Sequence, residues 1–389
     1  MTTEQQNQVK RRHCPVVKVC GGCQVQHLAY EQQISIKQKN VEKLLGGFHQ
    51  VDPIIQMNDP YFYRNKSTAT FAMDKKRKVI SGIYQKGTHQ VVSIDQCLLH
   101  DERADRIIVS IRDMLASFKM KPYDEDTKKG LLRHVQIRTG KKSGQIMVVL
   151  VIGSTVFPSR KKFMKALLDK HPEISTVVMN VNTKKTSMVL GDREQVLYGK
   201  GFIEDTLFDK VFRISPKSFY QVNPVQTEVL YQKAIDVANF KGNETIIDAY
   251  CGIGTIGMIM SDYVKKVIGV ELNRNAFKDA IQNAKRNGTK NVYFHHQDAS
   301  EFMQQMAAKK ETVDAVVMDP PRAGSTKLFI NAMVSIKPKK IVYISCNPET
   351  LQRDLQDITK KGYEVKSITP VDMFPGTDHI ETVVLLTKK

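Results

Sequence analysis

The sequence predicts an α/β protein with two domains, a basic and β-rich domain over residues 1–214 and an open α/β domain over residues 215–389. Its 389 residues, of which 41% are hydrophobic and 25% charged, suit a globular protein of this size. The first 215 residues hold 36 of the 59 lysines and arginines but only 21 of the 40 acidic residues. After Ser215, short apolar runs alternate with amphipathic stretches, which is the pattern of βαβ units around a parallel sheet.

The basic residues of the first domain indicate a nucleic-acid partner. The whole chain has a formal net charge of +19, most of it in the first domain. Each basic run lies beside a strand-like segment, where it could be no more than a solvated hairpin tip. The summed asymmetry nevertheless favours phosphate contacts, which give affinity without sequence information. The runs are residues 75–78, 128–129, 141–142 and 160–162.

Apolar patterning argues against a membrane or secreted protein. The longest apolar run, Ile146–Ile152, is much shorter than the roughly 20 residues of a spanning helix, so it predicts a buried strand. The first residues lack the apolar core of a secretory signal. We therefore expect a cytoplasmic protein whose six cysteines do not form structural disulfides.

The second domain shows seven strand-like segments with helices between most of them. Asn223 and Pro224 are a favourable N-cap and first helical residue, and Asn287-Gly288 is a favourable helix end after residues 275–286. The predicted strands are Thr245–Asp248, Lys266–Glu271, Val292–His295, Asp314–Asp319, Lys340–Ser345, Glu364–Thr369 and Thr382–Leu386.

A glycine loop after the first of these strands predicts a nucleotide site. Gly252, Gly254 and Gly257 let the backbone pass close to a ligand, and Glu271 ends the next strand, where it can accept hydrogen bonds from ribose hydroxyls. The spacing G-x-G-x-x-G also matches a dinucleotide fingerprint. An NAD-dependent oxidoreductase therefore remains an alternative.

Further acids at the carboxyl ends of the strands favour a different ligand. Asp248, Asp298 and Asp319 lie along the edge where open α/β sheets bind ligands, and an acidic edge suits a cationic sulfonium better than a pyrophosphate. Asp319 begins the segment Asp-Pro-Pro-Arg. Amino-methyltransferases carry an aromatic residue at the position of Arg322, so this arginine argues against methylation of an exocyclic amine.

Two residues on the same edge predict covalent catalysis. Cys346 lies at the turn from the fifth strand into a helix, whose positive end is expected to lower the pKa of the thiol and favour thiolate. His379 and Glu381 lie in the last connection between strands. A carboxylate shielded from water there can act as a general base.

Four of the other cysteines form a candidate metal site. Cys14, Cys20 and Cys23 have the spacing C-x₅-C-x₂-C, and Cys97 lies further along the first domain. Four thiolates can hold zinc or an iron–sulfur cluster, and the spacing does not distinguish these two groups. Cys251, in the glycine loop, is expected to be a packing residue.

These motifs together resemble the RNA 5-methyluridine methyltransferases, and most closely the iron–sulfur members, which are 23S ribosomal RNA (uracil-5-)-methyltransferases. The resemblance runs from about Cys14 to the C-terminus. It rests on Cys-Gly-Gly-Cys-Gln-Val-Gln-His-Leu at 20–28, Ser-Phe-Tyr-Gln-Val-Asn at 218–223, Asp-Ala-Tyr-Cys-Gly-Ile-Gly at 248–254, Asp-Pro-Pro-Arg-Ala-Gly at 319–324, Ser-Cys-Asn-Pro-Glu-Thr-Leu at 345–351 and Asp-His-Ile-Glu at 378–381.

The resemblance implies a Rossmann-like, S-adenosylmethionine-dependent methyltransferase domain with a seven-stranded mixed sheet, and an N-terminal iron–sulfur RNA-binding domain. Cys346 would add to C6 of a flipped uridine, C5 would take the methyl group, and Glu381 would remove the C5 proton. Cofactor contacts would fall on Gln221, Tyr250, Glu271 and Asp319, with Asp298 as an addition.

The resemblance also implies a [4Fe–4S] cluster on Cys14, Cys20, Cys23 and Cys97. Transfer-RNA members generally lack this cluster, so 23S ribosomal RNA is the expected substrate and transfer RNA the alternative. Only thirteen residues precede Cys14, so the oligonucleotide-binding barrel that begins many ribosomal members is expected to be absent. A non-catalytic RNA-binding protein is a further alternative, and a monomer is expected.

Overall fold

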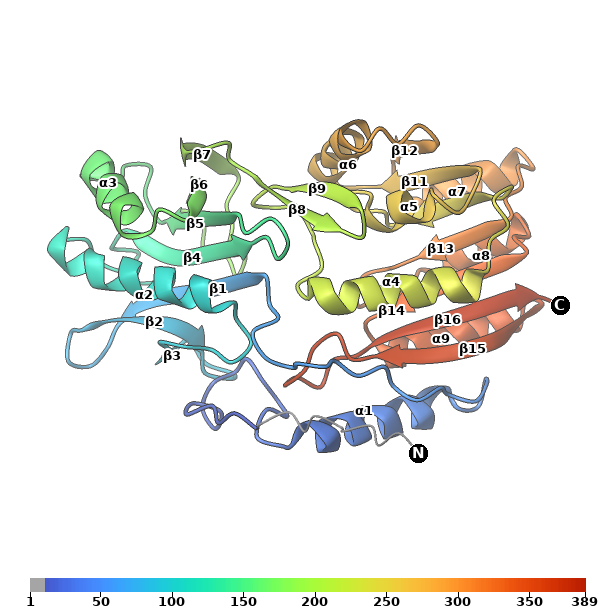
Figure 1. The fold of residues 1–389 in the computed structure, drawn as a ribbon, viewed down its shortest axis with the longest axis horizontal. Helices are drawn as coiled ribbons and strands as arrows, with labels where there is room; N and C mark the ends of the chain where they lie inside the picture. The colour runs from blue at the N-terminus through green and yellow to red at the C-terminus, as the bar shows by residue number, and fades with distance from the viewer. Residues whose placement is uncertain (1–10) are drawn as a thin grey trace, which may run out of the picture.

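The computed structural model describes residues 11–389, which fold into two lobes that lie side by side (Figure 1). Residues 1–10 of the predicted first domain lie outside the described residues. A sheet of seven strands forms the first lobe, in the order β3-β2-β1-β4-β5-β6-β7. Its strands are β1 (Lys66–Met73), β2 (Val79–Tyr84), β3 (Val91–Ser93), β4 (Leu132–Thr139), β5 (Ile146–Ile152), β6 (Ile174–Val181) and β7 (Arg193–Tyr198).

Two helices cover one face of this sheet. Apolar residues of α2 (Glu102–Ser117) and α3 (Arg160–Lys170) share one buried cluster with β1, β4, β5 and β6. Every residue of β5 is buried, which confirms the strand predicted from the longest apolar run. Three of the basic runs lie in loops and turns next to strands, but Arg160 begins α3, so the fourth run belongs to a helix.

The second lobe contains the predicted seven-stranded mixed sheet, in the order β12-β11-β10-β13-β14-β16-β15. The strands from β10 to β14 are parallel to their neighbours, whereas β16 is antiparallel to both β14 and β15. The strands are β10 (Thr245–Ala249), β11 (Lys266–Glu271), β12 (Val292–His296), β13 (Ala315–Met318), β14 (Lys340–Ser345), β15 (Tyr363–Val371) and β16 (Glu381–Lys388). Each overlaps the segment predicted for it.

Helices pack on both faces of the second sheet. One buried cluster joins the sheet to α4 (Pro224–Ala238), α5 (Thr255–Met260) and α6 (Arg274–Arg286). The other joins it to α7 (Ala299–Ala308), α8 (Lys327–Ser335) and α9 (Pro348–Thr359). The side chain of Asn223 accepts a hydrogen bond from the backbone N–H of Gln226, which confirms the predicted cap of α4.

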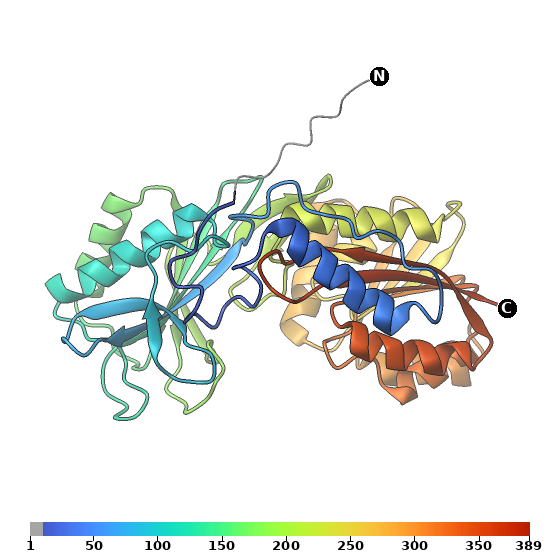
Figure 2. The same ribbon diagram turned by 90° about the horizontal axis from the view of Figure 1, so that it is seen from below.

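The N-terminal helix α1 (Tyr30–Leu45) belongs to the second lobe rather than the first. It lies beside α9 and β15 (Figure 2), and its buried residues Ile34, Val41 and Leu45 join the core on that side. Beyond the helix, Val51 and Ile55 form parallel bridges to β15. The chain therefore enters the second lobe before it builds the first, because the apolar stripe of α1 is buried there. The boundary at residues 214 and 215 stays a prediction.

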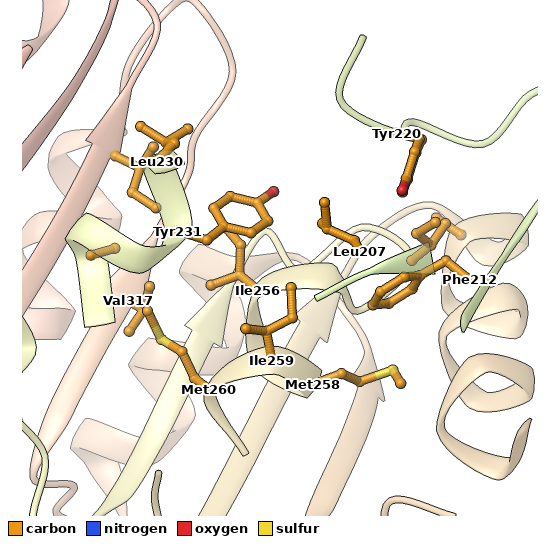
Figure 3. Close-up of a cluster of buried hydrophobic side chains, with 14 of the residues drawn as sticks. Leu207, Phe212, Tyr220, Leu230, Tyr231, Ile256, Met258, Ile259, Met260 and Val317 are labelled. Atoms are coloured by element: carbon orange, nitrogen blue, oxygen red, sulfur yellow. The ribbon is translucent and has the colours of Figure 1, made fainter. Parts of the chain in front are cut away.

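A hairpin and a shared apolar core join the two lobes. Strands β8 (Ile203–Leu207) and β9 (Lys210–Ile214) form the hairpin. Figure 3 shows Leu207, Phe212 and Tyr220 beside Tyr231 of α4 and residues of α5. The same cluster contains buried residues of β5 and β6, so the lobes have continuous packing between them. No helix within residues 11–389 is long and apolar enough to cross a membrane.

Candidate active site

A cavity of about 450 Å³ lies where the carboxyl ends of the second sheet meet the first lobe. Both lobes contribute to its wall, because Arg64 precedes β1 whereas the other lining residues belong to the hairpin-to-α4 segment and the second lobe. Six of the seven residues predicted for catalysis or cofactor binding line this cavity: Gln221, Tyr250, Glu271, Asp319, Cys346 and Glu381.

The glycine loop and Glu271 form one side of the cavity. The N–H of Gly252 donates to Oε2 of Glu271 at 2.9 Å, and the N–H of Asn273 donates to Oε1. Both carboxylate oxygens are therefore held by backbone donors at the end of β11. A Cβ added at Gly257 would lie 2.7 Å from Oδ2 of Asp248, so the close approach of α5 to β10 requires glycine there.

Tyr250 adopts a strained backbone conformation in this loop. Its φ of 66° lies in the left-handed region, which is uncommon for a residue with a side chain. The hydroxyl lies 3.0 Å from Oγ of Ser325, and the ring centroid is 5.4 Å from that of Phe329. Burial raises the pKa of Tyr250 to about 12. These contacts hold the ring in the cavity wall despite the strain.

Carboxyl groups along this edge have raised pKa values. Burial raises the pKa of Asp248 to about 8, and its buried Oδ1 has no hydrogen-bond partner within residues 11–389. Burial raises the pKa of Asp319 to about 7. The charges of Asp319 and Glu271 further raise the pKa of Asp248. A cationic ligand would stabilise the ionised forms of these acids, which is the electrostatic property that a sulfonium site needs.

The structure corrects the predicted state of Cys346. The residue lies between β14 and α9 as predicted, but the pKa of its thiol is raised to about 11. Burial contributes most, the charges of Glu381 and Asp319 add to it, and Arg322 opposes them. Burial and two neighbouring carboxyl groups therefore raise the pKa of the thiol by more than the positive end of α9 lowers it. At neutral pH this cysteine is therefore a thiol in the free protein.

Glu381 is a buried acid at the start of β16. Its side chain is inside the protein, with 3% of the residue exposed, and Oε2 has no hydrogen-bond partner among the described residues. Burial raises its pKa well above the ordinary value, the charge of Asp319 raises it further, and Arg322 lowers it. Such a carboxyl group has the high proton affinity and the shielding from water that a general base needs.

The remaining predicted residues take different positions. Gln221 is buried, and its backbone oxygen accepts a hydrogen bond from Nδ2 of Asn65 at 3.0 Å. Asp298 does not line the cavity; it caps α7 by accepting hydrogen bonds from the backbone N–H groups of Ser300 and Glu301. Its charge still raises the pKa of Tyr250, which does line the cavity.

Several lining residues were not singled out as site residues in the sequence. The most informative is Arg64, which reaches the cavity from the first lobe and has no local pattern to mark it. Phe219 is 62% exposed at the same cavity, although it falls within the motif that contains Gln221. Arg322 and His379, which the sequence had placed at the same edge as Asp319 and Glu381, also line it. The acidic site is therefore bordered by two arginines, Arg64 and Arg322, which can donate hydrogen bonds to phosphate or carbonyl oxygens.

All four cysteines of the candidate metal site line a second cavity, of about 250 Å³. Cys14, Cys20, Cys23 and Cys97 are free thiols, and Arg64, Lys66 and His100 lie in the same wall. Burial raises the pKa of Cys23 to about 12, and the charges of Cys97, Cys20 and Cys14 raise it further. Within residues 11–389, no group of three or more histidine, cysteine or acidic side chains is placed to hold a single metal ion.

Comparison with known proteins gives consistent matches. Residues 29–389 match the family described as tRNA (Uracil-5-)-methyltransferase, and this match begins after Cys23. An uncharacterized RNA methyltransferase of Halalkalibacterium halodurans is 42% identical over 381 residues, which are 97% of this chain and 83% of the relative. One from Listeria innocua is 42% identical over 380 residues, with the same coverage.

A solved structure matches both lobes. The crystal structure of Pyrococcus abyssi tRNA (uracil-54, C5)-methyltransferase in complex with S-adenosyl-L-homocysteine has a TM-score of 0.79 and 27% sequence identity. The match covers 97% of this chain and 87% of that one.

Proposed function

The chain belongs to the RNA (uracil-5-)-methyltransferase family and methylates C5 of uracil in RNA with S-adenosylmethionine, and we propose that its substrate is 23S ribosomal RNA. We further propose that Cys346 is the nucleophile and Glu381 the base. The observation that carries these roles is the cavity itself, which is lined both by Cys346 and by a buried carboxyl group whose Oε2 has no hydrogen-bond partner among the described residues.

In the proposed reaction, the target base leaves its stack and enters the cavity, at a cost of a few kcal/mol. Cys346 and Glu381 would both lose their protons to solvent once the positive charge of the sulfonium offsets that of Asp319, which raises both pKa values. The sulfur of Cys346 then forms a bond to C6, which makes C5 nucleophilic. S-adenosylmethionine supplies the methyl group when bound. Glu381 then accepts the C5 proton, and the electron pair of the broken C–H bond re-forms the C5–C6 double bond as the sulfur leaves C6.

The cofactor is proposed to lie along the acidic edge. Glu271 is held by backbone N–H groups and can accept hydrogen bonds from ribose hydroxyls. Tyr250 offers its ring, Asp319 its carboxylate and Gln221 its amide, and Asp298 contributes a nearby negative charge, which also raises the pKa of Tyr250. A bound sulfonium would offset the charge of Asp319. It would thereby lower the pKa of Cys346, which that charge raises.

We also propose that Cys14, Cys20, Cys23 and Cys97 hold a [4Fe–4S] cluster. The residues present fit such a group, because four free thiols line one cavity and each added thiolate charge opposes the ionisation of Cys23. Iron would relieve that repulsion and ligate the thiolates. The cluster would tie the segment around Cys20 to the loop that contains Cys97, within a basic RNA-binding lobe.

The choice between ribosomal and transfer RNA depends on this cysteine group. The Pyrococcus abyssi relative acts on transfer RNA by its name, so transfer RNA is the second candidate. The four cysteines and the basic first lobe favour 23S RNA. The protein is proposed to act as a monomer.

The test is methyl transfer from labelled S-adenosylmethionine to unmodified 23S RNA and to bulk transfer RNA, followed by nucleoside analysis. Label found as 5-methyluridine in 23S RNA would support the proposed substrate, and label in transfer RNA alone would overturn it. Cys346→Ala in parallel tests the nucleophile, because label that survives this substitution contradicts a covalent mechanism.

A further inference from the structure

Residues 372–380 join β15 to β16, and this β15–β16 connection leads into the active-site cavity. Phe374, Thr377 and His379 in it line the cavity, and Glu381 follows directly as the first residue of β16. Glu381 pairs with Val371, directly before Asp372, so the position of the proposed base depends on this strand pairing and on what holds the connection. Most of its contacts come from residues more than 300 positions earlier in the chain.

A buried ion pair anchors the start of the connection. Nζ of Lys37, in α1, donates to Oδ1 of Asp372 at 2.6 Å and to the backbone oxygen of Phe374 at 3.1 Å. The two charged side chains are 2% and 0% exposed. The hydroxyl of Tyr30 donates to Oδ2 of Asp372 at 2.9 Å and accepts from the N–H of Met57 at 2.8 Å.

Further hydrogen bonds hold the middle of the connection. Oε1 of Gln33, one turn before Lys37 on α1, accepts from the N–H of Gly376 at 2.8 Å. The oxygen of Gly376 accepts from the N–H of Val25 at 3.1 Å. Gly376 has a φ of 83°, and an added Cβ would lie 2.2 Å from Oε1 of Gln26. The connection thus fits closely into residues 24–37.

The ion pair is a poor source of net stability. Burial lowers the pKa of Lys37 even though the charge of Asp372 raises it, so desolvation outweighs the attraction. Apolar residues can often replace such a pair without loss of stability. The pair instead fixes the conformation of the connection, because Nζ of Lys37 donates both to Asp372 and to the backbone oxygen of Phe374.

We propose that Lys37 and Asp372 are positioning residues for Glu381, and that they act on the proton-removal half of the reaction. This inference rests on the proposed function of Glu381 and Cys346. Among the described residues, the side chains of Lys37 and Asp372 make no hydrogen bond to the glycine loop, Gln221, Asp319 or β14, on which cofactor binding and attack by Cys346 are proposed to depend. Loss of the pair should therefore slow elimination more than adduct formation, because small displacements of a base are costly.

The test follows each half of the reaction in Lys37→Met and Asp372→Asn. Denaturing gels with labelled RNA report the covalent protein–RNA adduct, and nucleoside analysis reports released 5-methyluridine. We expect turnover to fall about ten- to a hundredfold, the adduct to accumulate, and the affinity for S-adenosylmethionine to be unchanged. Product and adduct falling together, or turnover unchanged, would overturn the proposal.

Gln38→Leu is the matched control. Gln38 lies next to Lys37 on α1 and makes three hydrogen bonds, but to Glu42, Asp52 and Ile54 rather than to the connection. The Gln38→Leu substitution should leave the ratio of adduct to product as in the wild type. Accumulation of the adduct in this variant would overturn the proposal.

A folding defect is controlled by the double substitution Lys37→Met with Asp372→Leu, which replaces the pair by apolar groups. It is expected to fold and still to accumulate adduct, whereas normal turnover would overturn the proposal. A wild-type protein that forms neither adduct nor product would instead show that the proposed function is wrong.

Discussion

Cys346 and Glu381 both adjoin the last residue pair between two antiparallel strands. Ser345 at the end of β14 pairs with Thr382 of β16, and Cys346 follows Ser345 whereas Glu381 precedes Thr382. The charge of Glu381 accordingly raises the pKa of the thiol. Burial and the charge of Asp319 in turn raise the pKa of Glu381. The nucleophile and the base are therefore electrostatically linked before any substrate arrives.

Substitution of the nucleophile should abolish the reaction but not cofactor binding. In Cys346→Ala, no sulfur can add to C6, and we expect methyl transfer to RNA to fall by at least about 10³-fold. Calorimetry should show S-adenosylmethionine still bound, since Tyr250, Glu271 and Asp319 are intact. Residual formation of a covalent adduct in this variant would contradict the assignment.

Removal of the base should trap the intermediate. Glu381→Gln retains the shape of the side chain but cannot accept a proton, so product release should fall about 10²- to 10⁴-fold while the adduct accumulates on denaturing gels. Glu271→Gln is the matched control, since it should weaken cofactor binding without accumulation of the adduct. Equal product release by Glu381→Gln and the wild type would exclude Glu381 as the base.

Cofactor affinity should rise with pH around neutrality. The pKa of Asp319 is about 7 in the free protein, and a sulfonium favours the ionised carboxylate. Affinity for S-adenosylmethionine should therefore increase about tenfold from pH 6 to pH 8 and then level off. Titration calorimetry in buffers of different ionisation enthalpy should show proton release. In Asp319→Asn this contribution disappears, and an unchanged pH dependence would refute the assignment.

Burial of Asp248 should make stability fall as pH rises. Its folded-state pKa is about 8 against an ordinary value of 3.8, so the folded protein binds a proton that the unfolded chain has lost in that window. The free energy of unfolding should decline between pH 5 and pH 8 more steeply in wild type than in Asp248→Asn.

Asp314→Asn is the control for Asp248→Asn. The pKa of Asp314 is lowered by its hydrogen bond from the N–H of Thr245, so its contribution is complete above the ordinary pKa and constant from pH 5 to pH 8. Denaturant titrations at several pH values would measure both. Parallel curves for wild type and Asp248→Asn would contradict the prediction.

Metal analysis tests the cysteine group directly. Protein purified without oxygen should contain about four iron and four sulfide per chain, and Cys97→Ala should lose most of both. Cys251→Ala, which removes a buried thiol of the glycine loop, should retain them. Zinc in place of iron would refute the proposed cluster.

Much of the site could be predicted from local patterns. Strand-to-loop turns follow from apolar runs that end in glycine, proline or acidic residues, and this places Asp319, Cys346 and Glu271 at one edge of a parallel sheet. The cap by Asn223 and the buried strand β5 were predictable for the same reason, since both depend on neighbours in sequence. Arg64 was not, because only the contact between the lobes brings it to the cavity.

The sequence by itself determined the order of strands in the second domain, the chemical groups at its sheet edge and the grouping of the cysteines, because these depend on residue type and short spacing. Tertiary structure decided the ionisation of those groups. A helix end beside Cys346 predicts a lowered pKa, yet burial and two acids from other strands raise it. It also decided that Lys37 meets Asp372, 335 residues away. Burial and electrostatic interaction depend on distance in space, which short patterns in the sequence do not encode.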